Sequence, residues 1–148
     1  MKRKFSTAWK ASKQPRKQRK YRYNAPLHIR HRFLSAHLSK ELREKLGFRS
    51  IPVRKGDKVR VMRGEYKGVK GTVIRVDTKK LKIYIDSVKR KKVSGQEVHV
   101  PIDPSKVEII ELAKDKVREK IIKRRSKEEK EKVAKKQKEL KALSFPSS

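Results

Sequence analysis

The pattern that most constrains this chain is a two-residue alternation of apolar and polar side chains, confined to residues 53–112. Val59 and Val61, for example, fall on one side of a run whose other side carries Lys58 and Arg60. This is the period of strands with one buried face. Several short strands in one span predict a small closed barrel, in which no strand edge is left to pair with other chains. The predicted strands lie at about 57–63, 68–77, 80–86, 98–102 and 106–112.

In one predicted strand, at 68–77, the apolar residues switch from one face of the strand to the other. Val69 and Val73 share one side, whereas Ile74 and Val76 take the other. A bulge or a sharp bend restores a continuous buried face, and we expect it at Gly71, because glycine tolerates that backbone geometry.

Charge is the second constraint. The chain of 148 residues has 46 Lys or Arg against 16 Asp or Glu, a formal net charge of +30. Such an excess makes a free compact domain repel itself, and a polyanionic partner relieves that repulsion. Neutralised RNA phosphates also release condensed counterions, so the sequence predicts RNA binding rather than a merely solvated basic surface.

Other classes of protein are disfavoured by what the sequence lacks. There is no apolar run of about 18 residues to span a bilayer, and no apolar stretch follows the basic N-terminus as in a signal peptide. We therefore expect no membrane partner. The absence of cysteine excludes disulfides and thiolate metal sites, and it fits an intracellular protein.

Residues 1–24 are predicted to form a basic extended arm. The first carboxylate of the chain is Glu41, and the arm shows no helical or strand period, so we expect disorder in the free protein. Basic residues alternate with aromatic ones, and such an arm is expected to order on RNA through phosphate contacts and base stacking. The alternative is a disordered solubility tail with incidental aromatics. The four aromatics are Phe5, Trp9, Tyr21 and Tyr23.

Residues 25–52 are predicted to hold a loop and a short helix. Residues 25–38 indicate a turn or short helix with a connecting loop. A clearer helix follows, because Ser39 is a good N-cap and Gly47 is suited to the left-handed conformation that ends a helix. Pro52 then prevents any continuation.

Residues 113–148 are predicted to form a charged helical tail, a single long helix. Val117 and Ile121 continue an apolar stripe from Ala113 and are expected to dock on the barrel. The stretch 123–132 has no apolar residue, so we expect it to face solvent or RNA.

The most informative stretch is residues 53–77, VRKGDKVRVMRGEYKGVKGTVIRVD. Its tight loop, 63–68, has two glycines that permit positive φ and close approach of a ligand to the backbone. Together with the strand alternation and the internal Gly71, this stretch resembles the KOW motif of RNA-associated SH3-like barrels. The predicted fold is mainly β: a small SH3-like barrel with a KOW motif over 53–112, a basic N-terminal arm with a short helix, and a long charged C-terminal helix.

The sequence around this motif resembles one family. RFLSAHLSKELREKLGFRSIPVRKGDKVRVMRGEYKGVKGTV is similar to the archaeal and eukaryotic branch of universal large-subunit ribosomal protein twenty-four, whose members have a similar lead into the KOW motif. GQEVHVPIDPSKVEIIEL resembles the closing strands of that family. His37 stands where the family pattern has proline, which affects local loop geometry. The resemblance covers about residues 20–116.

The resemblance implies a structural constituent of the large ribosomal subunit, in the cytoplasm, that binds large-subunit rRNA directly. It also implies a role early in subunit assembly, a position near the peptide exit tunnel and neighbouring large-subunit proteins as partners. Neither a cofactor nor a small-molecule substrate is implied. The candidate rRNA-binding residues are Lys2, Arg3, Lys4, Trp9, Arg16, Lys17, Arg19, Lys20, Tyr21, Arg22, Arg30, Arg32, Arg54, Lys55, Arg63, Gly64, Tyr66, Lys67, Gly68 and Lys70, with Gly71 as a structural glycine.

No enzymatic or metal chemistry is predicted. Of the four histidines, His28, His31, His37 and His99, the first two are spaced to share a helix face, but no cysteine or carboxylate lies near them to complete a tetrahedral metal site. The sequence has neither a nucleophile elbow nor a phosphate loop.

Two other functions compete with the ribosomal one. A KOW-containing transcription elongation factor usually carries an additional polymerase-binding domain, for which residues 1–52 are too short and too basic. A general nucleic-acid-binding protein, such as a chaperone or nucleoid protein, would bind any polyanion. Co-sedimentation with the large subunit through high salt distinguishes the ribosomal protein from both.

Overall fold

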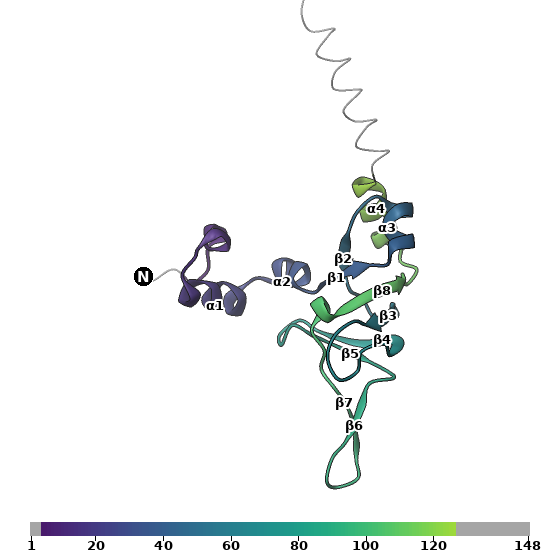
Figure 1. Ribbon diagram of the computed structural model, residues 1–148. Coiled ribbons are helices and arrows are strands. Elements are labelled where there is room, and N and C mark those ends of the chain that lie inside the picture. The colour runs from purple at the N-terminus through teal and green to yellow at the C-terminus, as the bar shows by residue number, and fades with distance from the viewer. Residues whose placement is uncertain (1–3, 127–148) are drawn as a thin grey trace, which may run out of the picture.

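The computed structural model describes residues 4–126 of the chain (Figure 1). Within them, helices dominate the N-terminal third and strands the remainder. In chain order the elements are η1 (Thr7–Ala11, a 3-10 helix), α1 (Pro15–Asn24), α2 (Leu27–Phe33), β1 (Ser35–Leu38), α3 (Lys40–Leu46), β2 (Ser50–Pro52), β3 (Lys58–Val61), β4 (Lys70–Asp77), β5 (Lys82–Ile85), β6 (Lys89–Lys91), β7 (Glu97–His99), η2 (Pro104–Lys106, a 3-10 helix), β8 (Val107–Glu111) and α4 (Lys116–Arg125).

Six strands form one mixed sheet in the order β2-β1-β8-β3-β4-β5. Strand β1 runs parallel to β8, where His37 is the partner of Glu108, and the other neighbouring pairs are antiparallel. Beyond β5, the backbones of Ile83 and Ile102 exchange two hydrogen bonds of 2.9 Å. The mainly-β prediction is thus confirmed for the described residues, and the sheet is consistent with a small barrel.

The sheet differs from the prediction at two places. Strands β1 and β2 lie within 25–52, predicted as loop and helix, yet they form one end of the sheet. The strand predicted at 98–102 is divided, because β7 pairs with β6 in a separate hairpin, while Ile102 is buried in the core and Val100 packs against it. In Figure 1 this β6–β7 hairpin projects from the body of the barrel.

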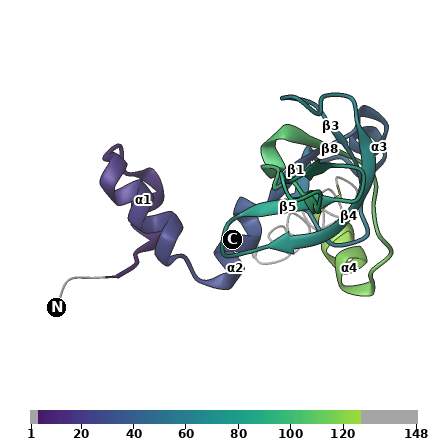
Figure 2. The same cartoon turned by 90° about the horizontal axis from the view of Figure 1, so that it is seen from below.

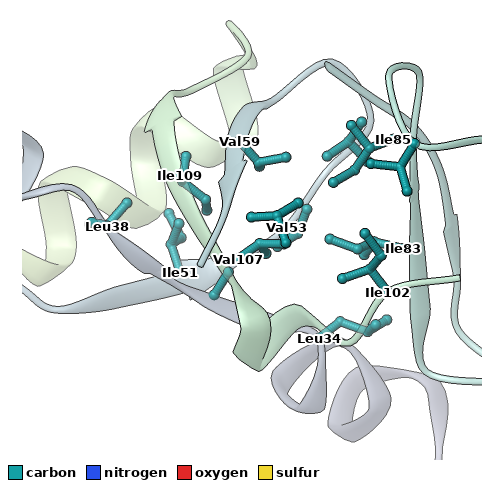
Figure 3. Packing of buried hydrophobic residues seen from close by; sticks show 14 residues of the cluster. Leu34, Leu38, Ile51, Val53, Val59, Ile83, Ile85, Ile102, Val107 and Ile109 are labelled. Atoms are coloured by element: carbon teal, nitrogen blue, oxygen red, sulfur yellow. The ribbon is translucent and has the colours of Figure 1, made fainter. Parts of the chain in front are cut away.

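The barrel encloses one apolar core (Figure 3). Val59, Ile83, Ile85 and Ile109 are fully buried, at the positions where alternation predicts inward-facing side chains. Burying one such side chain contributes about 1.5–3 kcal/mol, so this cluster dominates the stability of the barrel. Its members are Leu34, Ala36, Leu38, Ile51, Val53, Val59, Val61, Val73, Ile83, Ile85, Val88, Ile102, Val107 and Ile109.

The irregularity predicted in β4 is present, but it is not at Gly71. The pairing with β5 shifts between Val73 and Arg75, which leaves Ile74 as the extra, exposed residue. Gly71 pairs regularly with Val59. Glycine is needed at this position because neighbouring side chains leave no room for a Cβ atom. A Cβ atom there would lie 2.3 Å from a carboxylate oxygen of Asp86 and within 2.6 Å of two further side chains.

Helix α3 confirms the predicted capping signals. The Ser39 hydroxyl accepts a 3.3 Å hydrogen bond from the Leu42 amide, and Glu41 lies in the first turn. Gly47 ends the helix in the left-handed region with φ 73°. Local signals at both ends therefore mark where this helix begins and ends, and Leu42 and Leu46 pack it against the core.

The N-terminal arm corrects the prediction of an extended segment. It contains η1 and α1, and the following α2 leads into the barrel, so that α1 projects to one side (Figures 1 and 2). Tyr21, Ala25 and Ile29 are buried in a second apolar cluster, against which Phe5, Trp9 and Phe33 pack. The overlooked signal is an apolar residue at every fourth position, 21, 25, 29 and 33. This spacing continues across the break between α1 and α2.

Of the two residues predicted to dock helix α4 on the barrel, Ile121 is half-buried beside Ile51 and Pro52, but Val117 is not buried. Val117 is exposed, whereas Arg118 is buried and Ile122 contacts the core. The helix ends at Arg125, because Ser126 has an extended backbone. The remainder of the predicted long helix, 127–148, lies outside the described residues.

Candidate RNA interface

The loop between β3 and β4 is held in one shape by backbone hydrogen bonds. The amide of Gly68 donates a hydrogen bond to the carbonyl of Val61 at 2.8 Å, and the amide of Lys67 donates one to the carbonyl of Gly64 at 3.1 Å. Gly64 and Gly68 have φ values of 92° and 88°, as predicted for this loop. The loop is therefore a fixed platform rather than a flexible connection.

Basic side chains surround this platform. Arg63, Lys67 and Lys70 are exposed, while Tyr66 is half-buried and packs against the core. Tyr66 therefore anchors the loop, and the three cations remain accessible to phosphates.

Aromatic residues of the arm mostly pack on one another. The Tyr21 ring stacks on Phe5 with centroids 5.2 Å apart and meets Phe33 edge-on at 5.6 Å. The Lys20 ammonium lies 5.2 Å from the ring centroid of Trp9. Tyr21 is 6% exposed, so its ring stabilises the arm and presents no face to an RNA base.

Tyr23 is the aromatic residue of the arm that is free to stack. Its side chain is 79% exposed, and it lines a pocket of about 530 Å³ between α1 and the β4–β5 turn. Arg19 and Arg22 from α1 and Lys79 from the turn line the same pocket. A ring beside several cations is the combination that binds a base and its phosphate, and the candidate set omitted Tyr23 and Lys79.

Two of the candidate arginines make contacts within the protein. Arg30 donates to the carbonyl oxygens of Ala25 at 2.8 Å and Tyr23 at 2.6 Å, at the end of α1. Arg54 forms an ion pair with Asp115, which holds the start of α4 near the barrel. Both side chains therefore have a structural role.

The remaining candidates divide by exposure. Lys2 and Arg3 lie outside the described residues, and Lys20 and Trp9 are half-buried. Gly64 and Gly68 are exposed with the loop. The exposed basic candidates are Lys4, Arg16, Lys17, Arg19, Arg22, Arg32, Lys55, Arg63, Lys67 and Lys70.

The β6–β7 hairpin carries a basic group that the candidate set missed. Lys89, Arg90, Lys91 and Lys92 are consecutive and exposed, and Val93 at the tip is fully exposed. The signal was visible in the sequence as four successive cations just before the Ser-Gly turn. Because the hairpin lies apart from the core, these side chains are accessible to a partner.

His37 lies in a strongly positive pocket of about 280 Å³. Its Nδ1 accepts a 3.2 Å hydrogen bond from Arg49. Burial lowers the pKa of His37 below its usual value, and the positive charges of Arg49, Arg43 and Arg63 lower it further. A neutral imidazole among guanidinium groups is therefore the stable form in the free protein.

Two other kinds of site are absent from residues 4–126. No three histidine, cysteine or carboxylate side chains come together as metal ligands there. No helix in that range is long and apolar enough to cross a membrane.

Comparison with known proteins places these features in context. A family model described as that of the ribosomal proteins L26 of eukaryotes and their archaeal L24 counterparts matches residues 12–125. The "Large ribosomal subunit protein uL24" of Pyrobaculum islandicum is 53% identical over 116 residues, which cover 78% of this chain and 94% of the relative. The protein of the same name from Korarchaeum cryptofilum is 52% identical over 115 residues, covering 77% and 88%.

Proposed function

Because the chain belongs to the archaeal and eukaryotic branch of the uL24 family of large-subunit ribosomal proteins, we propose that it is a structural, non-enzymatic constituent of the large subunit that binds large-subunit rRNA directly. The observation that carries the proposal is the rigid β3–β4 loop, with Arg63, Lys67 and Lys70 exposed around it. Fixed cations bind a folded polyanion with a smaller loss of side-chain and loop entropy than mobile ones.

The barrel is the SH3-like type, and residues 53–77 are its KOW motif. Two positive-φ glycines in the β3–β4 loop and the close packing at Gly71 support this assignment. The chain has four units: an arm at 1–24, a connecting segment at 25–52, the barrel at 53–112 and a tail at 113–148. The connecting segment also contributes β1 and β2 to the sheet.

The rRNA interface comprises the KOW loop, the basic face of α1 and the β6–β7 hairpin. In these three places exposed cations stand on a defined backbone. The protein acts in the cytoplasm, early in subunit assembly, near the peptide exit tunnel and beside neighbouring large-subunit proteins. The family resemblance supports these roles, and the net charge of +30 supports the RNA partner.

Charge reversal in the KOW loop tests the proposal. Replacing Arg63, Lys67 and Lys70 by Glu should weaken binding to a large-subunit rRNA fragment by at least about 100-fold, or about 2.7 kcal/mol, in a filter assay. The fold should be intact by circular dichroism, since these side chains lie outside the core. The control, with the same change in net charge, replaces the exposed Lys40, Lys45 and Lys114 by Glu.

Equal losses in the two triple variants would mean that binding depends on net charge alone, as for a general nucleic-acid-binding protein. Gradient fractionation of cell extract in high salt adds a second criterion. Retention in the large-subunit fraction is expected of a ribosomal constituent, whereas a transcription elongation factor would leave it.

Deletion of residues 1–22 measures the contribution of the arm. The deletion removes ten Lys or Arg. If most of them meet phosphates, the slope of log affinity against log salt should become shallower by several units, at roughly 0.9 unit per phosphate. An unchanged slope would make the arm a solvated tail and leave the KOW loop as the main RNA contact.

A further inference from the structure

A cleft of about 540 Å³ lies where α4 meets the β1–β2 end of the sheet, away from the KOW loop. Four arginines from three parts of the chain line it: Arg32 near the end of α2, Arg54 after β2, and Arg118 and Arg125 on α4. Convergence of four guanidinium groups on one cleft is costly unless an anion shares the space.

Two of these four charges are compensated inside the protein. Arg118 forms a bidentate ion pair with Asp57, in which Nη2 donates to Oδ2 at 2.9 Å, and Arg54 pairs with Asp115. For Arg32 and Arg125, no carboxylate partner is found among residues 4–126. The cleft therefore retains an excess of positive charge.

The stacking of Arg125 on a neighbouring ring leaves its hydrogen-bond donors available to a ligand. Arg125 stacks on the Phe48 ring, with its guanidinium carbon 4.5 Å from the ring centroid, so the N–H groups at its edge remain available. Arg118 is 2% exposed, and its Nε donates no hydrogen bond to any described residue. That nitrogen is shielded from solvent, so a ligand in the cleft does not reach it, and the donors open to a ligand are those of Arg32 and Arg125.

The rest of the lining is apolar or hydroxylic. Ile51, Pro52 and Ile121 contribute apolar surface, while Ser35 and Ser50 contribute hydroxyl groups. A free anion would not need an apolar wall. A nucleotide step does, because its sugar presents C–H groups whereas its phosphate is charged and rich in acceptors.

We propose that this cleft binds one ribose-phosphate step of the rRNA backbone, with Arg32 and Arg125 as its phosphate ligands. The proposal rests on the proposed function, because it assumes rRNA as the partner. It adds a second attachment point on the side of the barrel formed by β1, β2 and α4. The arginine pairs with Asp57 and Asp115 keep α4 in place and so form the cleft.

The first test replaces Arg32 and Arg125 by Gln, singly and together, and measures the salt dependence of binding to a large-subunit rRNA fragment. The double variant should bind roughly 10-fold more weakly and have a slope shallower by about one unit, as expected for one lost phosphate contact. The matched control for each single variant is Arg124→Gln, which removes one charge from an exposed neighbour that does not line the cleft.

The second test locates the RNA directly. The chain has no cysteine, so Ser50→Cys places a single thiol in the cleft, and Glu44→Cys places one on the exposed face of α3. Saturating rRNA fragment should slow alkylation of the Ser50→Cys thiol by about 10-fold or more, as burial of the thiol under RNA requires, and leave that of Glu44→Cys nearly unchanged.

The outcomes separate the two proposals. If the wild type fails to bind the rRNA fragment, the proposed function is overturned, and this inference with it. If the wild type binds, but Arg32→Gln keeps the wild-type slope and the Ser50→Cys thiol stays reactive, only the cleft proposal is overturned. Arg32 has an exposed side chain, so Arg32→Gln remains informative even if loss of the Arg125–Phe48 stacking disturbs α4.

Discussion

The barrel and the N-terminal arm are made from the same basic chain, but they are held together differently. The barrel buries fourteen apolar side chains from segments that are distant in sequence, whereas the second cluster, between the arm and α2, buries three, of which only Tyr21 lies in the arm. The stabilising free energy of burial is roughly proportional to the apolar area removed from water. The barrel therefore has its own source of stability, and the arm has little. The arm therefore depends on a partner in a way that the barrel does not.

Removal of one buried charge should have the largest effect on the barrel. Asp57→Ala leaves Arg118 buried without its carboxylate and also removes the acceptor for the amides of Arg54 and Ala113. Breaking a buried pair in this way costs about 3–5 kcal/mol, measured as the free energy of unfolding in urea. As a control, Glu111→Gln breaks the exposed pair with Lys58 and should cost less than about 1 kcal/mol. Similar losses in both variants would contradict the role given to burial.

Overpacking at Gly71 should have the next largest effect. Gly71→Val introduces carbon atoms where the side chains of Asp86, Ile85 and Ser87 already lie, and should cost about 3 kcal/mol in thermal unfolding. Gly64→Ala is the control. Its φ is also unfavourable, but no atom lies within 4 Å of the added carbon, so about 1 kcal/mol is expected. A melting temperature of Gly71→Val equal to that of the wild type would exclude this close packing.

A substitution in the arm should destabilise the arm and leave the stability of the barrel unchanged. Tyr21→Ala removes the contacts with Phe5 and Phe33, and should lower the local free energy of opening of α1 by about 2 kcal/mol. Amide hydrogen exchange reports this loss residue by residue. The exchange of β3 and β4 should not change, and Tyr23→Ala, which removes an exposed ring, is the control. Faster exchange throughout the barrel would show that the two regions fold as one unit.

The smallest expected effect concerns pH. The pKa of His37 is below its usual value of 6.5, so protonation favours the unfolded chain. The contribution of neutral His37 to stability is therefore lost as the pH falls from the pKa of His37 in the unfolded chain through its lower pKa in the folded protein. In an NMR titration, Arg49→Gln should raise the pKa of His37, whereas Lys92→Gln on the distant hairpin should not. A pKa that does not respond to Arg49→Gln would exclude Arg49 as a cause and leave burial, Arg43 and Arg63.

Local signals in the sequence were sufficient for α3 and for strands such as β3 and β5. Ser39 and Gly47 mark both ends of that helix, and alternation marks β3 and β5. Strand β1 shows the same alternation, with Ala36 and Leu38 buried, but it is only four residues long and contains no β-branched residue. It is a strand because β2 pairs with one of its edges and β8, which is distant in sequence, pairs with the other.

The candidate site was predicted in part for the same reason. Charge and glycine spacing were enough to select the β3–β4 loop as a candidate, and its cations are exposed. The burial of Tyr21 and the ion pair of Arg54 with Asp115 depend on partners elsewhere in the chain. The location of the bulge at Ile74 likewise follows from how β4 pairs with β5 rather than from the presence of a glycine.

The position of β8 in the sheet sets an order for folding during synthesis. Strand β8 lies between β1 and β3, although it is the last strand of the sheet to be translated. Until residues 107–111 have emerged, β1 and β2 have no strand that joins them to β3, β4 and β5. At about 5–20 residues per second, the nascent chain spends several seconds with two unjoined halves and exposed apolar faces. The two halves of the sheet therefore join only after β8 is made, and a chain cut before Val107 lacks the strand that connects them.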